Sequence, residues 1–413
     1  MNVKIIPSKT SGQIYAPPSK SYAHRYIISA FLSKSEGIIK NVGTSKDVLA
    51  TLNALSSIGL KYEILEENVK ISFCEPQKNA VLDCNESGST LRFLFPLVCA
   101  LGLKASFTGS EKLLSRPMKD LTECLNANGA KINGFNVSGK LKSGEYKING
   151  GVSSQFISGL MFALPLLDGD SKIIIDGEEV SKDYLLVTLD VLSKFNINIE
   201  KTDYGYYVKG NQKYEMPKQM TVEGDYSGAS FILTLGALSD GVTVLNLNEN
   251  SLQGDKKIID VLSRFGAIVE KVDGGYFVKR NKLKGITVDC ENIPDLVQIL
   301  SVLASFSRGK SKFLNVSRLK LKESDRILGI INNLKNAKIK AKYKNGNLIV
   351  YGGKPKAGTF NGDNDHRTVM SAVVLASQVK DSSVVLGAEA ISKSYPSFFR
   401  DFIALGGKVD GDI

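Results

Sequence analysis

The sequence predicts an α/β fold of two domains, built from a unit that is repeated six times. A polar cluster followed by an apolar, helix-like run recurs at intervals of about 70 residues. Each run is followed by a second helix-like segment and then by alternating, strand-like residues. Self-similarity at a fixed period indicates one repeated supersecondary unit, and units with both helices and strands make an α/β fold. The runs open at Ser19, Glu86, Ser153, Asp225, Asp295 and Asp365.

The first helix of each unit is expected to be buried, and the second to lie outside. Residues 156–167 and 231–238 are apolar on most sides, which is typical of a helix enclosed by a core. The second helices are more amphipathic, and most stop at a residue that suits a left-handed C-cap. These stops are Gly59, Gly129, Asn196, Gly266, Ala337 and Gly406. Return strands are expected at 206–209, 276–279 and 348–351, after turns that contain Gly205, Gly274, Gly275, Asn345 and Gly346.

Three units per domain would give two domains of about 200 residues each, which is a usual domain size. Residues 1–18 with 224–413 are expected to form domain I, which contains both termini, and residues 19–223 to form domain II. A Pro-Pro pair breaks regular structure at the first crossing, and the strand at 3–6 is expected to pair with the C-terminal domain. The chain would then cross twice, and an active-site cleft is expected between the domains.

The composition is that of a globular protein with a positive charge. Hydrophobic residues make up 43% and charged residues 23%, and the formal net charge is +11, which favours acidic partners. No run of five basic residues and no nucleic-acid-binding signature occurs. The better interpretation is therefore that positive charge is distributed over the protein and attracts anions to a cleft. Five cysteines without a CxxC pair indicate neither disulfides nor a zinc site. Without a signal-peptide pattern or an apolar stretch long enough to span a bilayer, a cytoplasmic location is expected.

Helix starts are natural anion sites, because their free N–H groups and partial positive charge attract negative ligands. Lys20, Ser21 and Arg25 open the first run, and Ser21 and Arg25 would share one face of a helix. Gly88, in the polar cluster 86–92, would let backbone N–H groups cradle a phosphate. Arg116 precedes a proline, which disfavours helical geometry and predicts a loop position for this arginine.

The second half of the chain repeats the pattern with more charge. Charged residues crowd the segment 318–326, where Lys322 and Arg326 carry like charges four residues apart. Such a pair disfavours a bare helix, and a bound anion would relieve the repulsion. Further polar groups at expected helix starts are Ser153, Ser154, Gln155, Asp295, Asp365, His366, Arg367 and Lys393.

Taken in order, these segments resemble the enolpyruvyl transferase family along the whole chain, and within it the enzymes that act on shikimate 3-phosphate. The motifs that carry the resemblance are residues 19–25, 85–92, 116–117, 153–155, 293–295, 322–326, 365–367 and Lys393. The resemblance implies two domains of three βαβαββ units each, an inside-out α/β barrel with buried inner helices. It also implies transfer of the enolpyruvyl group of phosphoenolpyruvate to the 5-hydroxyl of shikimate 3-phosphate, through a tetrahedral ketal, with release of phosphate. This is a step of chorismate and aromatic amino acid biosynthesis.

The resemblance also implies roles for individual residues. The shikimate 3-phosphate contacts fall on Lys20, Ser21, Arg25, Ser153, Ser154, Gln155, Ser181, Asp295 and Lys322. The phosphoenolpyruvate contacts fall on Lys20, Gly88, Arg116, Gln155, Arg326, Arg367 and Lys393. Asp295 is expected to be the base for the 5-hydroxyl, and Glu323 and Lys20 to transfer the proton at the methylene carbon. No cofactor and no metal are expected, because lysines and arginines supply the positive charge, and the family implies a monomer.

Two positions depart from the usual family pattern. Glu86 and Arg318 stand where asparagines are common, next to the phosphate of phosphoenolpyruvate and to shikimate 3-phosphate respectively. A carboxylate beside a phosphate is unfavourable unless it is paired or protonated. We therefore hypothesise that Glu86 turns toward a neighbouring Arg or Lys and does not bind ligand, with Arg318 either pairing with it or adding an anion contact. Glyphosate, which occupies the phosphoenolpyruvate site in this family, would have room at Gly88. Sensitivity of the enzyme to glyphosate would also depend on the charge of Glu86.

Two alternatives remain at this point. The sister enzyme that uses UDP-N-acetylglucosamine usually has Lys-Asn where this chain has Lys20 and Ser21, and a cysteine in the loop that corresponds to 108–116, which has none here. A nucleic-acid-binding protein related to the RNA 3′-terminal phosphate cyclases would share the repeat and suit the positive charge. However, the chain lacks their catalytic histidine motif, and no segment stands out in which basic and aromatic residues alternate. Small anionic substrates, and neither nucleic acid nor membrane, are the expected partners.

Overall fold

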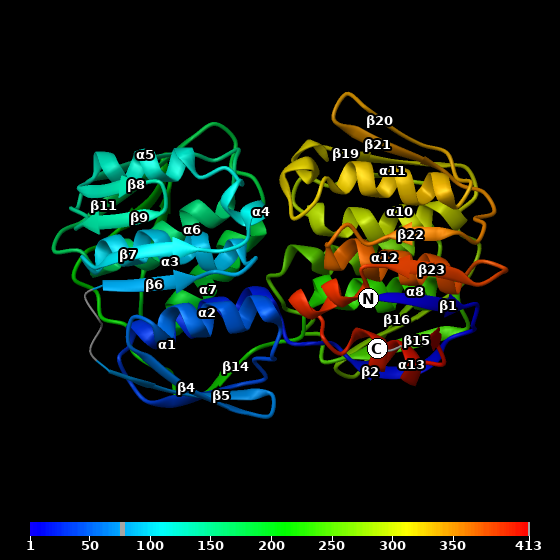
Figure 1. Cartoon of the computed structure of the whole chain (residues 1–413), viewed down its shortest axis with the longest axis horizontal. Helices are drawn as coiled ribbons and strands as arrows, with labels where there is room; N and C mark the ends of the chain where they lie inside the picture. The colour runs from blue at the N-terminus through cyan, green and yellow to red at the C-terminus, as the bar shows by residue number, and fades with distance from the viewer. Residues whose placement is uncertain (75–78, 412–413) are drawn as a thin grey trace. The chain divides into compact units, whose positions relative to one another are not determined.

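Six four-stranded sheets of one design run through the residues that the structure describes (Figure 1). The structure is a computed structural model, and it describes residues 1–74 and 79–411. In each sheet one edge strand pairs in parallel with its neighbour, and the remaining pairs are antiparallel. This confirms the predicted α/β fold of six repeated units with the order βαβαββ.

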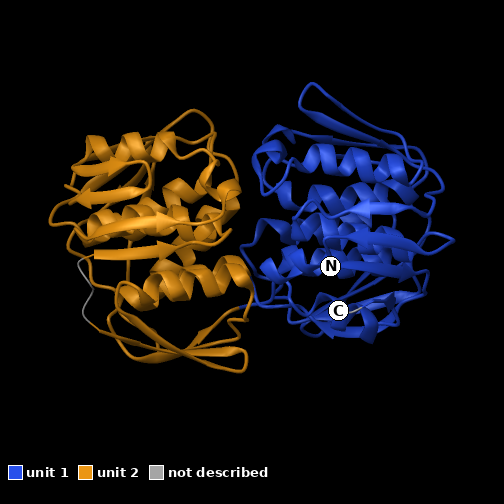
Figure 2. Ribbon diagram, viewed as in Figure 1, with its two compact units in different colours: residues 1–19, 223–413 blue, residues 20–222 orange. Residues whose placement is uncertain are grey.

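Residues Lys20–Val222 form one compact unit, called unit 2 (Figure 2). Its sheets have the strand orders β14-β3-β5-β4, β6-β7-β9-β8 and β10-β11-β13-β12. The strands are β3 (Gly37–Lys40), β4 (Leu60–Leu65), β5 (Asn68–Phe73), β6 (Asn79–Asp83), β7 (Lys104–Thr108), β8 (Ala130–Asn133), β9 (Asn136–Gly139), β10 (Glu145–Asn149), β11 (Ser171–Asp176), β12 (Ile199–Thr202), β13 (Gly205–Val208) and β14 (Met220–Thr221). The helices are α1 (Lys20–Leu32), α2 (Lys46–Ser56), α3 (Gly88–Ala100), α4 (Glu111–Leu114), α5 (Lys119–Ala127), α6 (Ser154–Ala163) with the 3-10 turn η1 (Leu164–Leu166), and α7 (Lys182–Lys194).

Residues Met1–Ser19 and Glu223–Ile413 form the other compact unit, unit 1 (Figure 2). Its sheets have the orders β16-β17-β15-β2, β18-β19-β21-β20 and β22-β23-β1-β24. The strands are β1 (Asn2–Ile6), β2 (Ser11–Tyr15), β15 (Gly241–Leu245), β16 (Ile268–Val272), β17 (Gly275–Lys279), β18 (Thr287–Asp289), β19 (Lys310–Leu314), β20 (Ala341–Lys344), β21 (Asn347–Tyr351), β22 (Thr359–Asn361), β23 (Ser383–Leu386) and β24 (Lys408–Asp410). The helices are α8 (Tyr226–Leu238), α9 (Ile258–Phe265), α10 (Val297–Phe306), α11 (Arg326–Asn336), α12 (His366–Ser377) and α13 (Phe398–Ala404). The 3-10 turns are η2 (Gly254–Lys257), η3 (Pro294–Leu296), η4 (Ser317–Leu321) and η5 (Ala388–Lys393).

The sheets of both units use strands from distant parts of the sequence. As predicted, the N-terminal strand β1 pairs near the C-terminal end, between β23 and β24. The strand β2 precedes α1 in the chain but pairs in parallel with β15, whereas β14 precedes α8 but pairs in parallel with β3. The strand before α1 therefore belongs to a sheet of unit 1, and the strand before α8 belongs to a sheet of unit 2.

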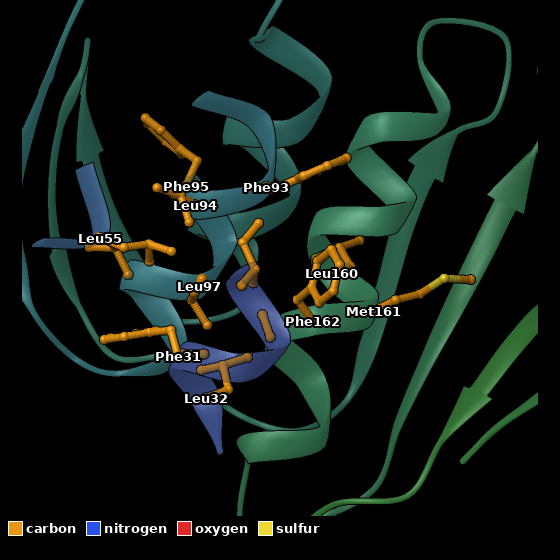
Figure 3. Packing of buried hydrophobic residues seen from close by; sticks show 14 of the residues in the cluster. Phe31, Leu32, Leu55, Phe93, Leu94, Phe95, Leu97, Leu160, Met161 and Phe162 are labelled. Carbon is orange, nitrogen blue, oxygen red and sulfur yellow. The ribbon is translucent and has the colours of Figure 1, made fainter. Parts of the chain in front are cut away.

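The inner helices are buried as the sequence predicts. All residues of α8 are buried, as are all but Gln155 in α6. Figure 3 shows the core of unit 2, where Phe93 of α3 and Phe162 of α6 lie with ring centroids 5.6 Å apart. At Gly159 the two helices come so close that an added Cβ would lie 2.4 Å from the carbonyl oxygen of Arg92. Glycine is therefore required there by close backbone approach.

The predicted helix ends are present, with two differences: the left-handed residue after α11 is Lys338 and not Ala337, and the run 156–167 is divided. The left-handed residues after the second helices include Gly59, Gly129, Asn196, Gly266, Lys338 and Gly406. The run 156–167 does not form one α-helix, because α6 ends at Ala163 and continues as a 3-10 turn that contains Pro165. Proline has no N–H to donate to the preceding turn. In the described part of the chain, no helix is long and apolar enough to cross a membrane.

Replacing Gly159 by Ala is expected to lower the free energy of unfolding by about 1–3 kcal/mol, because the new methyl group would push α6 away from α3. In urea unfolding followed by circular dichroism, the matched control is Gly329→Ala in α11. There the nearest atom to an added Cβ is the side-chain carboxylate of Asp363, which can move. A Gly159 variant as stable as the control would contradict the close-approach argument.

Candidate active site

In unit 2, Arg25 on α1 is a buried cation surrounded by neutral acceptors. Its guanidinium donates to Thr188 Oγ1 (2.8 Å) and to the carbonyl oxygens of Ser21 (2.8 Å) and Tyr184 (3.0 Å). Burial lowers the pKa of Arg25 to about 10, so the group stays charged at neutral pH. Neutral acceptors orient a guanidinium but do not balance its charge, which leaves this position suited to a negatively charged ligand.

The starts of α3 and α6 bring three of the predicted residues together. Arg116 lies on a loop, as predicted, and its guanidinium covers Gly88, where an added Cβ would lie 2.7 Å from Nη1. Gln155 accepts from Arg92 Nη1 (2.9 Å) and donates to Ser89 Oγ (2.9 Å). The absence of a side chain at Gly88 therefore makes room for an arginine, which together with the start of α3 forms an anion-binding geometry.

Serine side chains cap the starts of α2, α3, α4 and α6 in unit 2. Ser153 Oγ accepts from the N–H of Gln155 (3.3 Å), which confirms the predicted N-cap of α6. The cap of α3 is Ser87, so Glu86 lies just outside the helix that it was expected to open. Ser181, ahead of α7, is buried and has a left-handed backbone with φ of 54°. Non-glycine residues adopt this conformation only at a cost, and such positions are concentrated at functional sites.

In unit 1, Arg326 is the centre of a buried ion-pair network. Its guanidinium contacts Asp365 Oδ2 (2.8 Å), Asp295 Oδ1 (2.7 Å) and Glu323 Oε2 (2.7 Å). Its side chain is only 1% exposed. Burial alone would raise the pKa of Asp365, but the charge of Arg326 outweighs it and holds that pKa below the usual value. One guanidinium thus favours the ionised form of the buried Asp365 and also pairs with the carboxylates of Asp295 and Glu323.

Asp295 gathers cations from three segments. Besides Arg326, Lys322 Nζ lies 3.4 Å from its Oδ1 and Arg367 Nη2 lies 3.4 Å from its Oδ2. The expectation that Lys322 and Arg326 lie on the same helix is wrong. Lys322 has an extended backbone before α11, and the carboxylate of Asp295 bridges the two cations. The like charges are therefore balanced within the protein before any substrate binds.

The remaining predicted cations of unit 1 contact backbone carbonyl groups. Lys393 Nζ lies 2.5 Å from the carbonyl oxygen of Asn364, next to the start of α12. Arg318 Nη2 donates to the carbonyl oxygen of Glu291 (2.7 Å). The hypothesis about the orientation of Glu86 stays a prediction.

Sequence reasoning missed two acids beside these groups. Asp47, at the start of α2, lies 2.7 Å from Lys20 Nζ. Asp255, in η2, is buried, and burial together with the charge of Asp295 raises its pKa to about 7. Strongly shifted acids are concentrated at functional sites. No local pattern marks either residue, because each meets its neighbour only through tertiary structure.

The fold resembles those of solved enolpyruvyl transferases. The chain superposes on an EPSP synthase from Acinetobacter baumannii with a TM-score of 0.82 and 22% sequence identity, over 99% of this chain and all of that one. It also superposes on the enolpyruvyl transferase NikO from Streptomyces tendae with a TM-score of 0.80 and 13% identity, over 99% and 98% of the two chains. These likenesses define the class of fold as that of the enolpyruvyl transferases.

Sequence similarity is more specific. Residues 5–402 match the family model of EPSP synthase (3-phosphoshikimate 1-carboxyvinyltransferase). A 3-phosphoshikimate 1-carboxyvinyltransferase of Clostridium novyi is 40% identical over 99% of this chain and 98% of that relative. The chain belongs to the EPSP synthase family. Its activity is the transfer of an enolpyruvyl group in the shikimate pathway, and neither alternative considered above is favoured.

Replacing Arg326 by Met is expected to lower the free energy of unfolding at pH 8 by about 3–5 kcal/mol, because it removes the guanidinium that pairs with the buried carboxylate of Asp365 and takes one of three cations from Asp295. Without the guanidinium, burial would raise the pKa of Asp365 above that of the unfolded chain. The variant would then lose stability as the pH rises through that raised pKa. The difference from the unmodified protein should therefore be larger at pH 8 than at pH 5.

Urea unfolding at the two pH values measures this difference. The matched control is Arg264→Met, which removes an exposed guanidinium from a pair with Asp260, and it should change stability by less than about 1 kcal/mol at either pH. A destabilisation in the Arg326 variant that is the same at pH 5 and pH 8 would contradict the assignment of Arg326 as the counter-ion.

Proposed function

We propose that the transfer is carried out by the residues described above. The observation that carries this proposal is the carboxylate of Asp295, held by Lys322, Arg326 and Arg367. A carboxylate fixed among cations matches a reaction in which two polyanionic substrates must be brought together and the hydroxyl of one of them deprotonated. Unit 2 contributes the buried charge of Arg25 and the guanidinium of Arg116 beside Gly88.

Shikimate 3-phosphate would be bound by hydroxyl, amide and cationic groups. Arg25 suits its phosphate or carboxylate, because the neutral contacts of the guanidinium leave its charge for the ligand. Asp295 would accept the proton of the 5-hydroxyl. The full set proposed for this substrate is Lys20, Ser21, Arg25, Ser153, Ser154, Gln155, Ser181, Asp295 and Lys322.

Phosphoenolpyruvate would be bound by cations of both units. Arg326 and Arg367 suit its carboxylate, since a guanidinium binds a carboxylate through two parallel hydrogen bonds. Because Arg326 already contacts three carboxylates, this role requires that the substrate replace at least one of them. The full set proposed for this substrate is Lys20, Gly88, Arg116, Gln155, Arg326, Arg367 and Lys393.

The reaction would proceed by addition and then elimination. Asp295 removes the proton of the 5-hydroxyl as its oxygen attacks the central carbon of phosphoenolpyruvate, while Glu323 or Lys20 delivers a proton to the methylene carbon. The resulting tetrahedral ketal then loses phosphate and a methyl proton, which restores the enolpyruvyl double bond. Closure around the substrates would exclude water, which would otherwise attack the cationic intermediate.

The same proposal extends to the setting of the enzyme. We place it in the cytoplasm, as a monomer that uses small anionic substrates and binds neither nucleic acid nor membrane. Glyphosate would compete with phosphoenolpyruvate at Gly88, where a side chain would displace Arg116.

The first experiment is a phosphate-release assay with phosphoenolpyruvate alone, with added shikimate 3-phosphate, and with added UDP-N-acetylglucosamine. We expect release only with shikimate 3-phosphate, because the acceptor must supply the attacking hydroxyl. Release with the nucleotide sugar would contradict the proposed substrate, and release with neither acceptor would overturn the proposed function.

The Glu86 hypothesis has its own test. If Glu86 does not contact ligand, Glu86→Gln should change the KM for phosphoenolpyruvate by less than about threefold, because a solvent-screened charge contributes little. The matched control is Glu111→Gln on the exposed start of α4. A KM for phosphoenolpyruvate that falls by about tenfold or more would place Glu86 beside the phosphate instead.

A further inference from the structure

A chain of buried polar side chains joins α1, α2 and α3 in unit 2. His24 Nδ1 lies 2.7 Å from Thr51 Oγ1, which lies 2.6 Å from Thr90 Oγ1. Thr90 Oγ1 in turn donates to Ser87 Oγ over 2.7 Å. None of the four side chains belongs to a residue more than 1% exposed. Buried polar groups of this kind are kept in place by their mutual hydrogen bonds.

The hydrogen bonds that join His24, Thr51, Thr90 and Ser87 all run in one direction, from donor to acceptor. Each hydroxyl has one proton to donate, and that of Thr90 is given to Ser87. Thr51 must therefore donate to Thr90, and the remaining bond to Thr51 must be donated by His24. The imidazole is then the neutral tautomer with its proton on Nδ1, and in the described structure its Nε2 has no hydrogen-bond partner.

The surroundings of His24 agree with a neutral ring. Burial, followed by the positive charges of Lys20 and Arg25, lowers the pKa of His24 well below its ordinary value. The edge of the ring faces Phe93, with ring centroids 6.5 Å apart. The imidazole is thus a fixed hydrogen-bond donor, and not an acid or a base for the reaction.

The bond between His24 and Thr51 is one of two matched contacts between α1 and α2. One turn earlier, Lys20 Nζ contacts Asp47 Oδ2 over 2.7 Å. Both pairs are four residues apart on their helices, so they lie on the facing sides of α1 and α2. The helix α2, which carries none of the proposed substrate contacts, therefore fixes the position of Lys20 on α1.

At its other end, the chain of side chains reaches the start of α3. Ser87 is the N-cap, and its Oγ also accepts from the N–H of Thr90 (3.2 Å). The next residue is Gly88, against which the guanidinium of Arg116 packs. The hydroxyl of Thr90 thus connects α2 directly with the backbone that precedes the proposed phosphate site.

We propose that His24, Thr51 and Thr90 are positioning residues for phosphoenolpyruvate. Together they fix the start of α3, with Gly88, relative to the start of α1, with Lys20. This inference rests on the proposed function, since it assumes that both helix starts bind that substrate. It predicts that breaking these hydrogen bonds weakens the binding of phosphoenolpyruvate more than that of shikimate 3-phosphate.

The test is Thr90→Val, which replaces the hydroxyl by a methyl group of similar size. We expect the KM for phosphoenolpyruvate to rise by about tenfold, the scale of one lost buried hydrogen bond, with the KM for shikimate 3-phosphate within about twofold. Thr51→Val should have the same effect, and Thr90→Ser, which keeps the hydroxyl, should restore the KM to within about twofold. The matched control, Thr234→Val in α8, removes a buried hydroxyl without a partner in the described structure and should change neither KM.

A second measurement does not depend on activity. The chain has two histidines, so a protein labelled with ¹⁵N-histidine gives two sets of ring-nitrogen signals, which His366→Asn would assign. At neutral pH we expect His24 to have a protonated Nδ1 and an unprotonated Nε2 in the unmodified protein. The opposite tautomer, or a ring protonated at both nitrogens, would overturn the proposed direction of the chain.

The outcomes separate this inference from the proposed function. If the unmodified protein releases no phosphate with both substrates, the proposed function is overturned. The tautomer of His24 would still decide whether the hydrogen bonds run in the proposed direction. With an active unmodified protein, an unchanged KM for phosphoenolpyruvate in Thr90→Val would overturn the positioning role. So would equal increases of both KM values, because they would indicate a general loss of structure.

Discussion

The inner helices α1, α3, α6, α8, α10 and α12 are largely enclosed by apolar side chains and carry lysine, arginine and histidine only near their N-terminal ends, and the rest of the structure depends on this constraint. A helix such as α8, buried along its whole length, has unpaired N–H groups only in its first turn. Those groups need acceptors, and the chain supplies them with caps such as Ser87, Ser153, Asp225 and Asp365. Lys20, Arg25 and Arg367 of the candidate site lie in the first two turns of the inner helices α1 and α12. Its other charged residues lie on loops, on 3-10 turns or at the start of α11.

The two units balance their charges in different ways. In unit 2 the guanidinium of Arg25 is held by neutral oxygens, so a substrate anion would meet a charge that its protein contacts orient but do not neutralise. In unit 1, Arg326 is already surrounded by Asp295, Glu323 and Asp365. There a substrate carboxylate would gain less, because it must displace an existing partner. The same arrangement fixes the position of Asp295, the proposed base.

Polar side chains also hold helices in position relative to one another. The bonds from His24 through Thr51 to Thr90 join α1, α2 and α3, and the contact between Lys20 and Asp47 joins α1 and α2. Such contacts are specific in geometry where apolar packing is not, because a hydrogen bond has a direction and a narrow range of lengths. A reaction that must align two substrates needs this kind of precision in its supporting residues.

By itself the sequence determined the repeated unit, the buried character of the inner helices and the residues at their starts. These features are local: a period of about 70 residues, glycine or asparagine at a helix end, and proline after Arg116 all act on neighbouring backbone. The resemblance in its motifs also led to the family that the comparisons confirm. Tertiary structure alone decided that β2 and β14 change places, that Asp295 bridges Lys322 and Arg326, and that Asp47 holds Lys20. Each of these contacts joins residues from separate segments, and no pattern within one segment reveals which distant group will share its buried space.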